Sequence, residues 1–189
     1  MSSRQGGVAI PIRSFSQGKL RLSLPTKTRA DLIRSLATAL VQATAFPILV
    51  VSSDPEVRSW AEPFADLIDD PGTLNGAAES AVSWARHSAW KRCVIAHADL
   101  AFPGGIDQLI TAPLAHEVWA VQSHRDHGTP VISIPTHTEF TFSYGVDSFL
   151  RHEVEAKRRG LAFHALIDTD LGIDIDTQAD LEFLDAHTD

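Results

Sequence analysis

The chain has 189 residues, of which 44% are hydrophobic and 21% are charged, the balance of a globular protein with one domain. Its longest apolar run, residues 46–51, is far shorter than the ~20 residues that a membrane span needs, so we expect no membrane partner. The formal net charge of −8 argues against a general nucleic-acid binder. The single cysteine, Cys93, cannot form an internal disulfide, which favours a reducing cytoplasm.

Short apolar runs alternate with helical patterns along the chain, which is typical of an α/β domain with a mostly parallel sheet. We expect one domain over residues 1–189, with residues 1–7 flexible. The predicted strands are residues 8–12, 48–51, 67–68, 94–96, 118–121, 131–134, 138–142 and 163–167. The predicted helices are residues 29–43, a helix that begins at Pro55, and residues 75–89, 104–111, 147–159 and 177–186.

The two ends of the chain carry opposite charge. Residues 1–34 hold seven basic groups and one acid, whereas residues 168–189 hold eight acids and no Lys or Arg. The two ends could meet around a bound anion and its metal, or they could be two unrelated solvated surfaces. Charge alone favours the second interpretation.

A polar loop follows the first predicted strand, over residues 13–27, and carries Arg13, Lys19 and Arg21. Such a loop can offer backbone N–H groups and cationic side chains to phosphate oxygens. It is not a P-loop, because GxxxxGK[ST] is absent. An exposed basic surface loop is the alternative interpretation.

Three aspartates are candidates for binding a metal. Asp99 follows a predicted strand, where a carboxylate can bind Mg²⁺ or simply stabilise a turn. Asp174 and Asp176 are two apart on an extended segment, so both point to one face, roughly 6–7 Å apart, while Ile173 and Ile175 point to the other. The alternative is that Asp176 or the residue after it caps the last helix.

Two further loops could bind a ligand. Residues 127–129 and 142–149 offer hydroxyls and N–H groups near a helix start, which suits a phosphate or a carboxylate, although Ser148 could be an ordinary helix cap. Asn75 follows a Gly-containing turn and could cap a helix or bind a base; its spacing favours a cap. The nine histidines form no zinc pattern, and the GxSxG motif of hydrolases is absent.

Taken in order, these segments resemble the 2-phospho-L-lactate guanylyltransferase family of coenzyme F-420 biosynthesis, from the glycosyltransferase-A-like nucleotidyltransferase superfamily. The resemblance runs from Val8 to about Leu184. It implies a Rossmann-like three-layer α/β sandwich with a mostly parallel mixed sheet. The segments that carry it are residues 10–15 with Lys19 and Arg21, 50–55, 74–75, 98–100, 127–129, 142–148 with Arg151 and His152, and 174–177 with Asp180.

The resemblance implies that GTP reacts with a phosphorylated three-carbon acid, which is 2-phospho-L-lactate, phosphoenolpyruvate or 3-phosphoglycerate, and that pyrophosphate is released. It implies Mg²⁺ as the cofactor, no general base and a cytoplasmic enzyme, and it leaves a homodimer open. It also implies roles for individual residues: Lys19, Asp99 and Arg13 in catalysis; Pro11, Ile12, Arg13, Lys19, Ser52 and Asn75 in nucleotide binding; Thr129, Gly145 and Ser148 in acceptor binding; Asp99, Asp174 and Asp176 in metal binding.

The chain departs from the family pattern at two places. His97 stands where Pro or Gly is common and Ala101 where Pro is usual, and the acceptor loop over residues 123–130 is altered, with Pro130 lacking an N–H. Two alternatives therefore stay open. One is a related nucleotidyltransferase with a different nucleotide or a phosphonate acceptor, and the other is a non-catalytic nucleotide-binding homologue.

Overall fold

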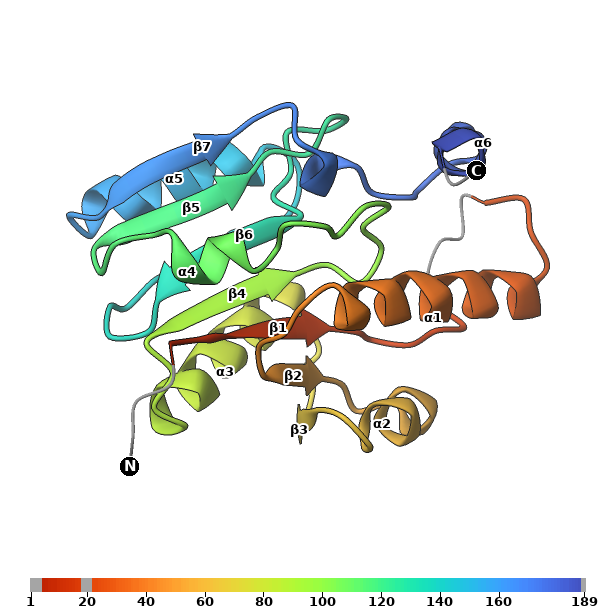
Figure 1. Cartoon of the computed structure of the whole chain (residues 1–189), viewed down its shortest axis with the longest axis horizontal. Helices are drawn as coiled ribbons and strands as arrows, with labels where there is room; N and C mark the ends of the chain where they lie inside the picture. Colours follow the sequence, from red (N-terminus) through yellow and green to blue (C-terminus); the bar gives the residue numbers. More distant parts are fainter. Residues whose placement is uncertain (1–4, 18–21, 188–189) are drawn as a thin grey trace.

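The structure is a computed structural model that describes residues 5–17 and 22–187. A seven-stranded sheet lies between two layers of helices (Figure 1), as predicted from the sequence. Among the described residues, β6 is the strand that runs antiparallel to its neighbours. In spatial order the strands are β3 (Asp66–Ile68), β2 (Ile48–Val51), β1 (Gly7–Pro11), β4 (Arg92–Ala96), β6 (Val131–Pro135), β5 (Glu117–Val121) and β7 (Ala162–Leu166).

The helices cover both faces of the sheet because alternate residues of the buried strands point to opposite sides. In β1, Val8 and Ile10 pack toward one helical layer and Ala9 toward the other. The first layer contains α1 (Thr26–Gln42), α2 (Pro55–Ala61) and α4 (Gln108–Thr111), and the second contains α3 (Leu74–His87) and α5 (Ser148–Arg158).

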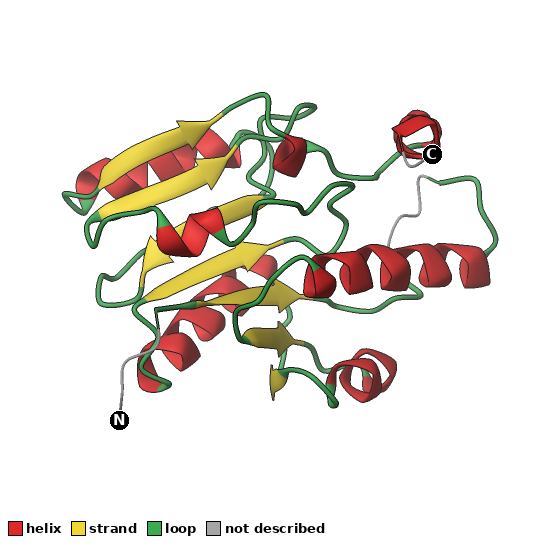
Figure 2. Ribbon diagram, in the orientation of Figure 1, coloured by secondary structure: helices red, strands yellow, loops and turns green. Residues whose placement is uncertain are grey.

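A short 3-10 helix, η1 (Asp170–Gly172), and the last helix, α6 (Gln178–His187), lie beyond the edge of the sheet (Figure 2). Leu184 of α6 packs against a small buried cluster that contains Leu36 of α1 and Ile175. The strand arrowheads other than that of β6 point toward this edge, so the loops that follow them gather there. Ligands of open α/β sheets bind at such carboxyl ends.

The start of β1 lies close to its neighbours. Gly6 and Gly7 are buried, and a Cβ on Gly7 would lie 2.3 Å from the Trp90 ring and 2.5 Å from the Pro47 carbonyl oxygen. Glycine is therefore required for this approach. Residues 1–4 lie outside the described residues, so the flexibility expected for the N-terminus stays a prediction.

The predicted strand over residues 138–142 is wrong. The segment is irregular. The Thr141 N–H donates to Oε1 of Glu155, on α5, at 3.0 Å and does not pair with a neighbouring strand. Phe140 and Phe142 are buried in the core beneath α5. The alternating apolar pattern thus reflects packing against a helix.

The predicted helix over residues 104–111 is shorter than expected, because α4 covers only Gln108–Thr111. Gly105 has a φ of 82°, which a right-handed helix does not accommodate. Among the described residues no helix is long and apolar enough to cross a bilayer. Cys93 is buried in β4, and burial raises the pKa of its thiol to about 12.

Candidate functional site

Asp99, Asp174 and Asp176 come together at the carboxyl edge of the sheet, where each offers one carboxylate oxygen and these oxygens lie within 4.8 Å of one another. The prediction that Asp174 and Asp176 share a face is confirmed. Ile173 and Ile175 point the other way and pack in the core between α1 and α6. Like charges this close repel unless a cation or a hydrogen-bond donor lies between them.

The backbone fixes this arrangement. Leu100 forms an isolated antiparallel β-bridge with Asp174, and the Ile175 N–H donates to the Asp99 carbonyl at 3.1 Å. The segment after β4 is therefore paired directly with the segment after η1. The Ser123 hydroxyl donates to Asp174 Oδ1 at 3.3 Å from the loop after β5.

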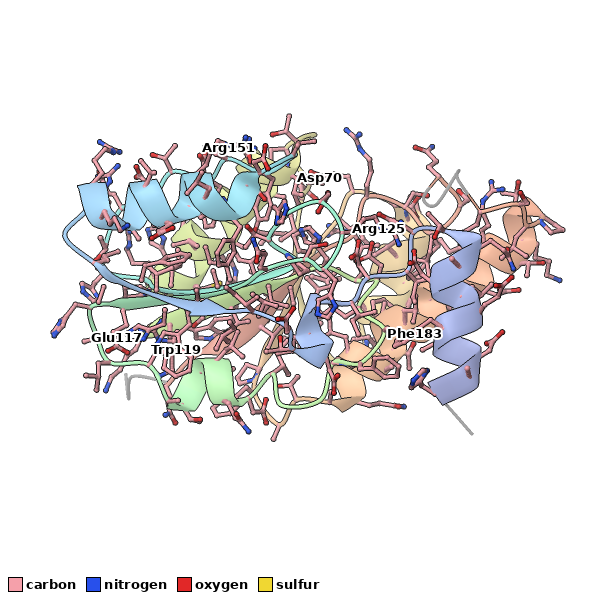
Figure 3. The ribbon with its side chains drawn as sticks, turned by 90° about the horizontal axis from the view of Figure 1, so that it is seen from above. Asp70, Glu117, Trp119, Arg125, Arg151 and Phe183 are labelled. Atoms are coloured by element: carbon pink, nitrogen blue, oxygen red, sulfur yellow. The ribbon has the colours of Figure 1, made fainter. Side chains whose placement is uncertain are left out.

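Asp180 holds the backbone next to this cluster. Its Oδ2 accepts from the N–H groups of Asp176 at 2.9 Å and Thr177 at 2.6 Å, and its Oδ1 pairs with Arg125, which lies beside α6 (Figure 3). Asp180 therefore binds the N–H groups ahead of α6, and the carboxylate of Asp176 lies in the acidic cluster.

The charge of Arg125 balances part of the acidic cluster. Partial burial tends to lower the pKa of Arg125, but the hydrogen bond and charge of Asp180, together with the charges of Asp174 and Asp176, raise it above its ordinary value. Figure 3 shows Arg125 near α6 and far from Glu117 and Trp119, which lie toward the other end of the molecule.

The predicted acceptor residues line the same cavity as the three carboxylates. This cavity has a volume of about 340 Å³, and Thr129, Gly145 and Ser148 contribute to its wall. The Thr129 and Ser148 hydroxyl oxygens are 3.1 Å apart, and both residues are at least 98% buried. Ser148 is not the cap of α5, because Asp147 occupies that position.

His152 is a residue of this site to which the sequence assigned no role. It is fully buried on α5, accepts from the Ser143 N–H at Nε2 at 3.0 Å, and places Nδ1 3.0 Å from the Thr129 hydroxyl. Burial, with the nearby charges of Arg151 and His97, lowers the pKa of His152 to about 4. The spacing of the sequence carries no signal for this contact, which depends on how α5 packs against the loop before β6.

A second cavity of about 200 Å³ lies next to the first, and Leu74 lines both. Pro11 at the end of β1 lines it, together with Ile12 and Arg13 from the loop that follows, which are residues predicted to bind the nucleotide. Arg13 Nη2 donates to the Gly72 carbonyl at 2.6 Å. A basic side chain from the start of the chain and acids from its end thus line neighbouring cavities.

Asn75 does not cap α3, because the hydroxyl of Thr73 accepts from the Gly76 N–H at 3.1 Å. The cap expected from spacing is therefore wrong. Asn75 Oδ1 instead accepts from the Tyr144 N–H at 2.7 Å and joins the start of α3 to the loop before α5. This loop lines the larger cavity through Tyr144.

Two of the described residues predicted to bind the nucleotide, Ser52 and Asn75, are not among those that line either cavity. Ser52 is fully buried after β2, its Oγ accepts from the Asp54 N–H at 3.2 Å, and it is not among the residues that line either cavity. Lys19 lies outside the described residues, as does Arg21.

The departures from the family pattern fit the fold. The His97 N–H donates to the Pro130 carbonyl oxygen at 2.9 Å. Pro130 thus anchors the loop through its carbonyl group, which needs no N–H. The His97 ring lies 5.4 Å from the Tyr144 ring, and both residues line the larger cavity. Ala101 is buried between α1 and the segment of Ile175.

Comparison with known proteins identifies sequence relatives over most of the chain. Residues 7–189 match the profile of the family described as "Guanylyl transferase CofC like". The phosphoenolpyruvate guanylyltransferase of Sphaerobacter thermophilus is 32% identical, with 94% of this chain and 91% of the relative aligned. The 2-phospho-L-lactate guanylyltransferase of Methanothermobacter thermautotrophicus is 27% identical, with 91% of this chain and 80% of the relative aligned.

Solved structures share the fold. The crystal structure of a protein described as a putative nucleotide-diphospho-sugar transferase, from Desulfovibrio desulfuricans G20, superimposes with a TM-score of 0.77 at 15% identity. The match covers 97% of this chain and 87% of that one. At this identity the likeness concerns the architecture, which agrees with the sandwich expected from the sequence.

Proposed function

Because the chain belongs to the guanylyl transferase CofC-like family, we propose that it transfers GMP from GTP to a phosphorylated three-carbon acid and releases pyrophosphate. The acceptor is 2-phospho-L-lactate, phosphoenolpyruvate or 3-phosphoglycerate, and the product serves coenzyme F-420 biosynthesis in the cytoplasm. The names of the relatives from Sphaerobacter and Methanothermobacter support the first two acids.

One observation carries the proposal at the level of the site. Three carboxylates line the same cavity as two buried hydroxyls, and Leu74 lines both this cavity and the one beside Arg13. Two polyanionic substrates react only if their charges are neutralised and their phosphates are held in line. An acidic cluster that lines such a cavity suits a divalent cation bound between the protein and the phosphates.

The donor set fits Mg²⁺. The cation prefers oxygen ligands at about 2.1 Å, so two of its ligands lie at most about 4.2 Å apart, and the three carboxylate oxygens lie within 4.8 Å of one another. Asp99, Asp174 and Asp176 would hold the ion. When bound, Mg²⁺ would neutralise phosphate charge and make the α-phosphorus more electrophilic.

The other residues serve binding in this proposal. Thr129, Gly145 and Ser148 hold the acid, and the backbone of Pro11 and Ile12 holds the nucleotide. The cations Arg13 and Lys19 stabilise the charge of the triphosphate and of the leaving pyrophosphate, while the direct contact between Asn75 and the nucleotide, and that of Ser52, stay predictions.

The reaction needs no general base. An oxygen of the acid's phosphate forms a bond to the α-phosphorus of GTP. The bond between the α-phosphorus and the oxygen that bridges it to the β-phosphorus breaks, and its electron pair leaves with pyrophosphate. The attacking phosphate is already ionised near neutral pH, so no proton has to be removed.

The test is release of pyrophosphate by the purified chain with Mg²⁺, with each nucleotide (GTP, CTP or ATP) paired in turn with each of the three acids. Release from GTP with one acid supports the proposal and names the acceptor. Release from CTP or ATP alone would instead support a related nucleotidyltransferase. Stabilisation by GTP and Mg²⁺ with no release for any acid would contradict the proposal and favour a nucleotide-binding homologue.

A further inference from the structure

A chain of hydrogen bonds runs behind the wall of the larger cavity. The Ser143 N–H donates to His152 Nε2 at 3.0 Å, His152 Nδ1 lies 3.0 Å from the Thr129 hydroxyl oxygen, and that oxygen lies 3.1 Å from the Ser148 hydroxyl oxygen. Thr129, Ser148 and His152 are all buried. Thr129 and Ser148 end the chain at the cavity, because both line it.

The first link fixes the tautomer of His152. A backbone N–H can only donate, so Nε2 must accept and carries no hydrogen. A neutral imidazole then has its hydrogen on Nδ1, which donates to the Thr129 oxygen. The low pKa of His152, about 4, agrees with a neutral ring near pH 7.

The backbone next to the first link is held by further contacts. The Ser143 carbonyl accepts from Arg151 Nη2 at 2.9 Å, and the next N–H, that of Tyr144, donates to Asn75 Oδ1 at 2.7 Å. The Tyr144 ring packs edge-on against the imidazole, with 5.0 Å between ring centroids. These contacts restrict the backbone that follows the Ser143 N–H and pack one side of the imidazole.

Counting hydrogens shows what this tautomer does for the cavity. Thr129 and Ser148 have one hydroxyl hydrogen each, and the bond between the two oxygens uses one of them. The other hydrogen stays available to a group in the cavity. In the opposite tautomer Nδ1 would accept the hydrogen of Thr129, Ser148 would donate to Thr129, and no hydroxyl hydrogen would remain.

We propose that His152 is a positioning residue that polarises the Thr129–Ser148 pair so that one hydroxyl donates to an anionic oxygen of the acceptor acid. The inference rests on the proposed function for the identity of that acid. The acid is bound as an anion, and a hydrogen bond to a charged oxygen is stronger than one between neutral groups. His152 itself does not touch the substrate.

The first experiment determines the tautomer of the His152 ring in the full chain, and it needs no turnover. Long-range ¹H–¹⁵N correlation spectra at pH 7, assigned by comparison with the His152→Asn variant, distinguish a hydrogen on Nδ1 from one on Nε2. We expect the Nδ1–H form. The Nε2–H form, or a doubly protonated ring, would overturn the inference whatever the enzyme's activity.

The second experiment measures binding of the acid. Replacement His152→Leu removes the donor, and we expect KM for the acid to rise about tenfold while KM for GTP changes less than twofold. His152→Asn keeps an N–H near the Nδ1 position, so its KM for the acid should be close to that of the wild type. His137→Asn, at an exposed position in the turn after β6, is the matched control and should leave both constants unchanged.

Thr129→Val tests whether His152 acts through Thr129. In that background His152→Leu should raise KM for the acid no further, because the hydroxyl it orients is gone. An equal further rise, or a rise in both KM values together, would overturn the positioning role.

The failure of this inference can be told from that of the proposed function. If the wild type released pyrophosphate with none of the three acids, the proposed function would fail. Calorimetric titration would then compare how tightly the wild type and His152→Leu bind phosphoenolpyruvate and inorganic phosphate. Both anions would accept the same hydroxyl hydrogen. Weaker binding by the variant would support the donor, and equal binding would overturn it.

Discussion

Leu100 and Asp174 are joined by an antiparallel β-bridge, although one follows the fourth strand and the other lies near the end of the chain. This pairing sets Asp99 beside Asp174 and Asp176 through backbone hydrogen bonds. The spacing of the three carboxylates therefore does not depend on flexible side chains alone, and a cation bound there would meet a prepared set of ligands.

Neutralising one carboxylate should lower turnover strongly and leave the fold intact. We expect Asp176→Asn, and likewise Asp99→Asn, to lower kcat by about 10² to 10³, because the amide keeps the shape but loses the charge that holds a cation against the phosphates. Pyrophosphate release and thermal unfolding are the measurements. Asp185→Asn, on the exposed side of α6, is the control and should be fully active. Full activity of Asp176→Asn would exclude the metal role.

Removing the carboxylate of Asp180 should loosen the metal-binding segment. Asp180 accepts from two backbone N–H groups ahead of α6, and loss of such a cap costs about 1–2 kcal/mol. We expect Asp180→Ala to lower the free energy of unfolding by that amount and to raise the Mg²⁺ concentration for half-maximal rate about tenfold or more. Asp180→Asn keeps an acceptor oxygen and should be affected less; equal effects in both variants would argue against the cap.

Glu155 should give the stability a pH dependence of known sign. The hydrogen bond from Arg158 is the largest cause that lowers the pKa of Glu155, and hydrogen bonds from Arg159 and the Thr141 N–H act in the same direction. Partial burial opposes them, and the net result is a pKa lowered from 4.5 to about 2. A pKa lowered on folding adds stability above about pH 4.5, which is lost as the pH falls toward 2.

Glu155→Gln should therefore destabilise the protein by about 1–2 kcal/mol at pH 7. The loss is no larger because Arg158 is partly exposed, so that solvent screens its charge. The difference from the wild type should shrink between pH 4.5 and pH 2. Urea unfolding at pH 7 and pH 3.5 measures it. A difference that is constant with pH would show that the ion pairs do not stabilise the charged form.

The variant Gly7→Ala should be less stable than the wild type, because the added Cβ would overlap the Trp90 ring and the Pro47 carbonyl. Overpacking of this kind costs about 1–3 kcal/mol. Gly104→Ala is the matched control, since nothing lies within 4 Å of its added Cβ. Chemical denaturation of the two variants measures the difference, and equal stabilities would contradict the packing at the start of β1.

Much of the fold could be predicted because buried strands of an α/β sheet are short apolar runs that local pattern detects. The strand around Ile48 and the start of α2 at Pro55 agree with their predictions. The alternation of Ile and Asp over residues 173–176 also fixed which side chains share a face.

Local pattern failed where a side chain from a distant element replaces a local partner. The segment that contains Phe140 and Phe142 has a strand-like alternation, but its N–H groups bond to side chains of α5. Asn75 has the spacing of a cap, but its amide bonds to Tyr144. These choices depend on which groups the fold brings within hydrogen-bond distance.

The sequence by itself determined most of the strands and helices, the shared face of Asp174 and Asp176, and the family to which the chain belongs, because periodicity and motif order are properties of neighbouring residues. The resemblance implied that Asp99 acts with this pair, but only the tertiary structure decided the backbone pairing that sets it there and the contact between His152 and Thr129. Both contacts join residues on different elements, and the packing of the sheet edge and of α5 sets their distances.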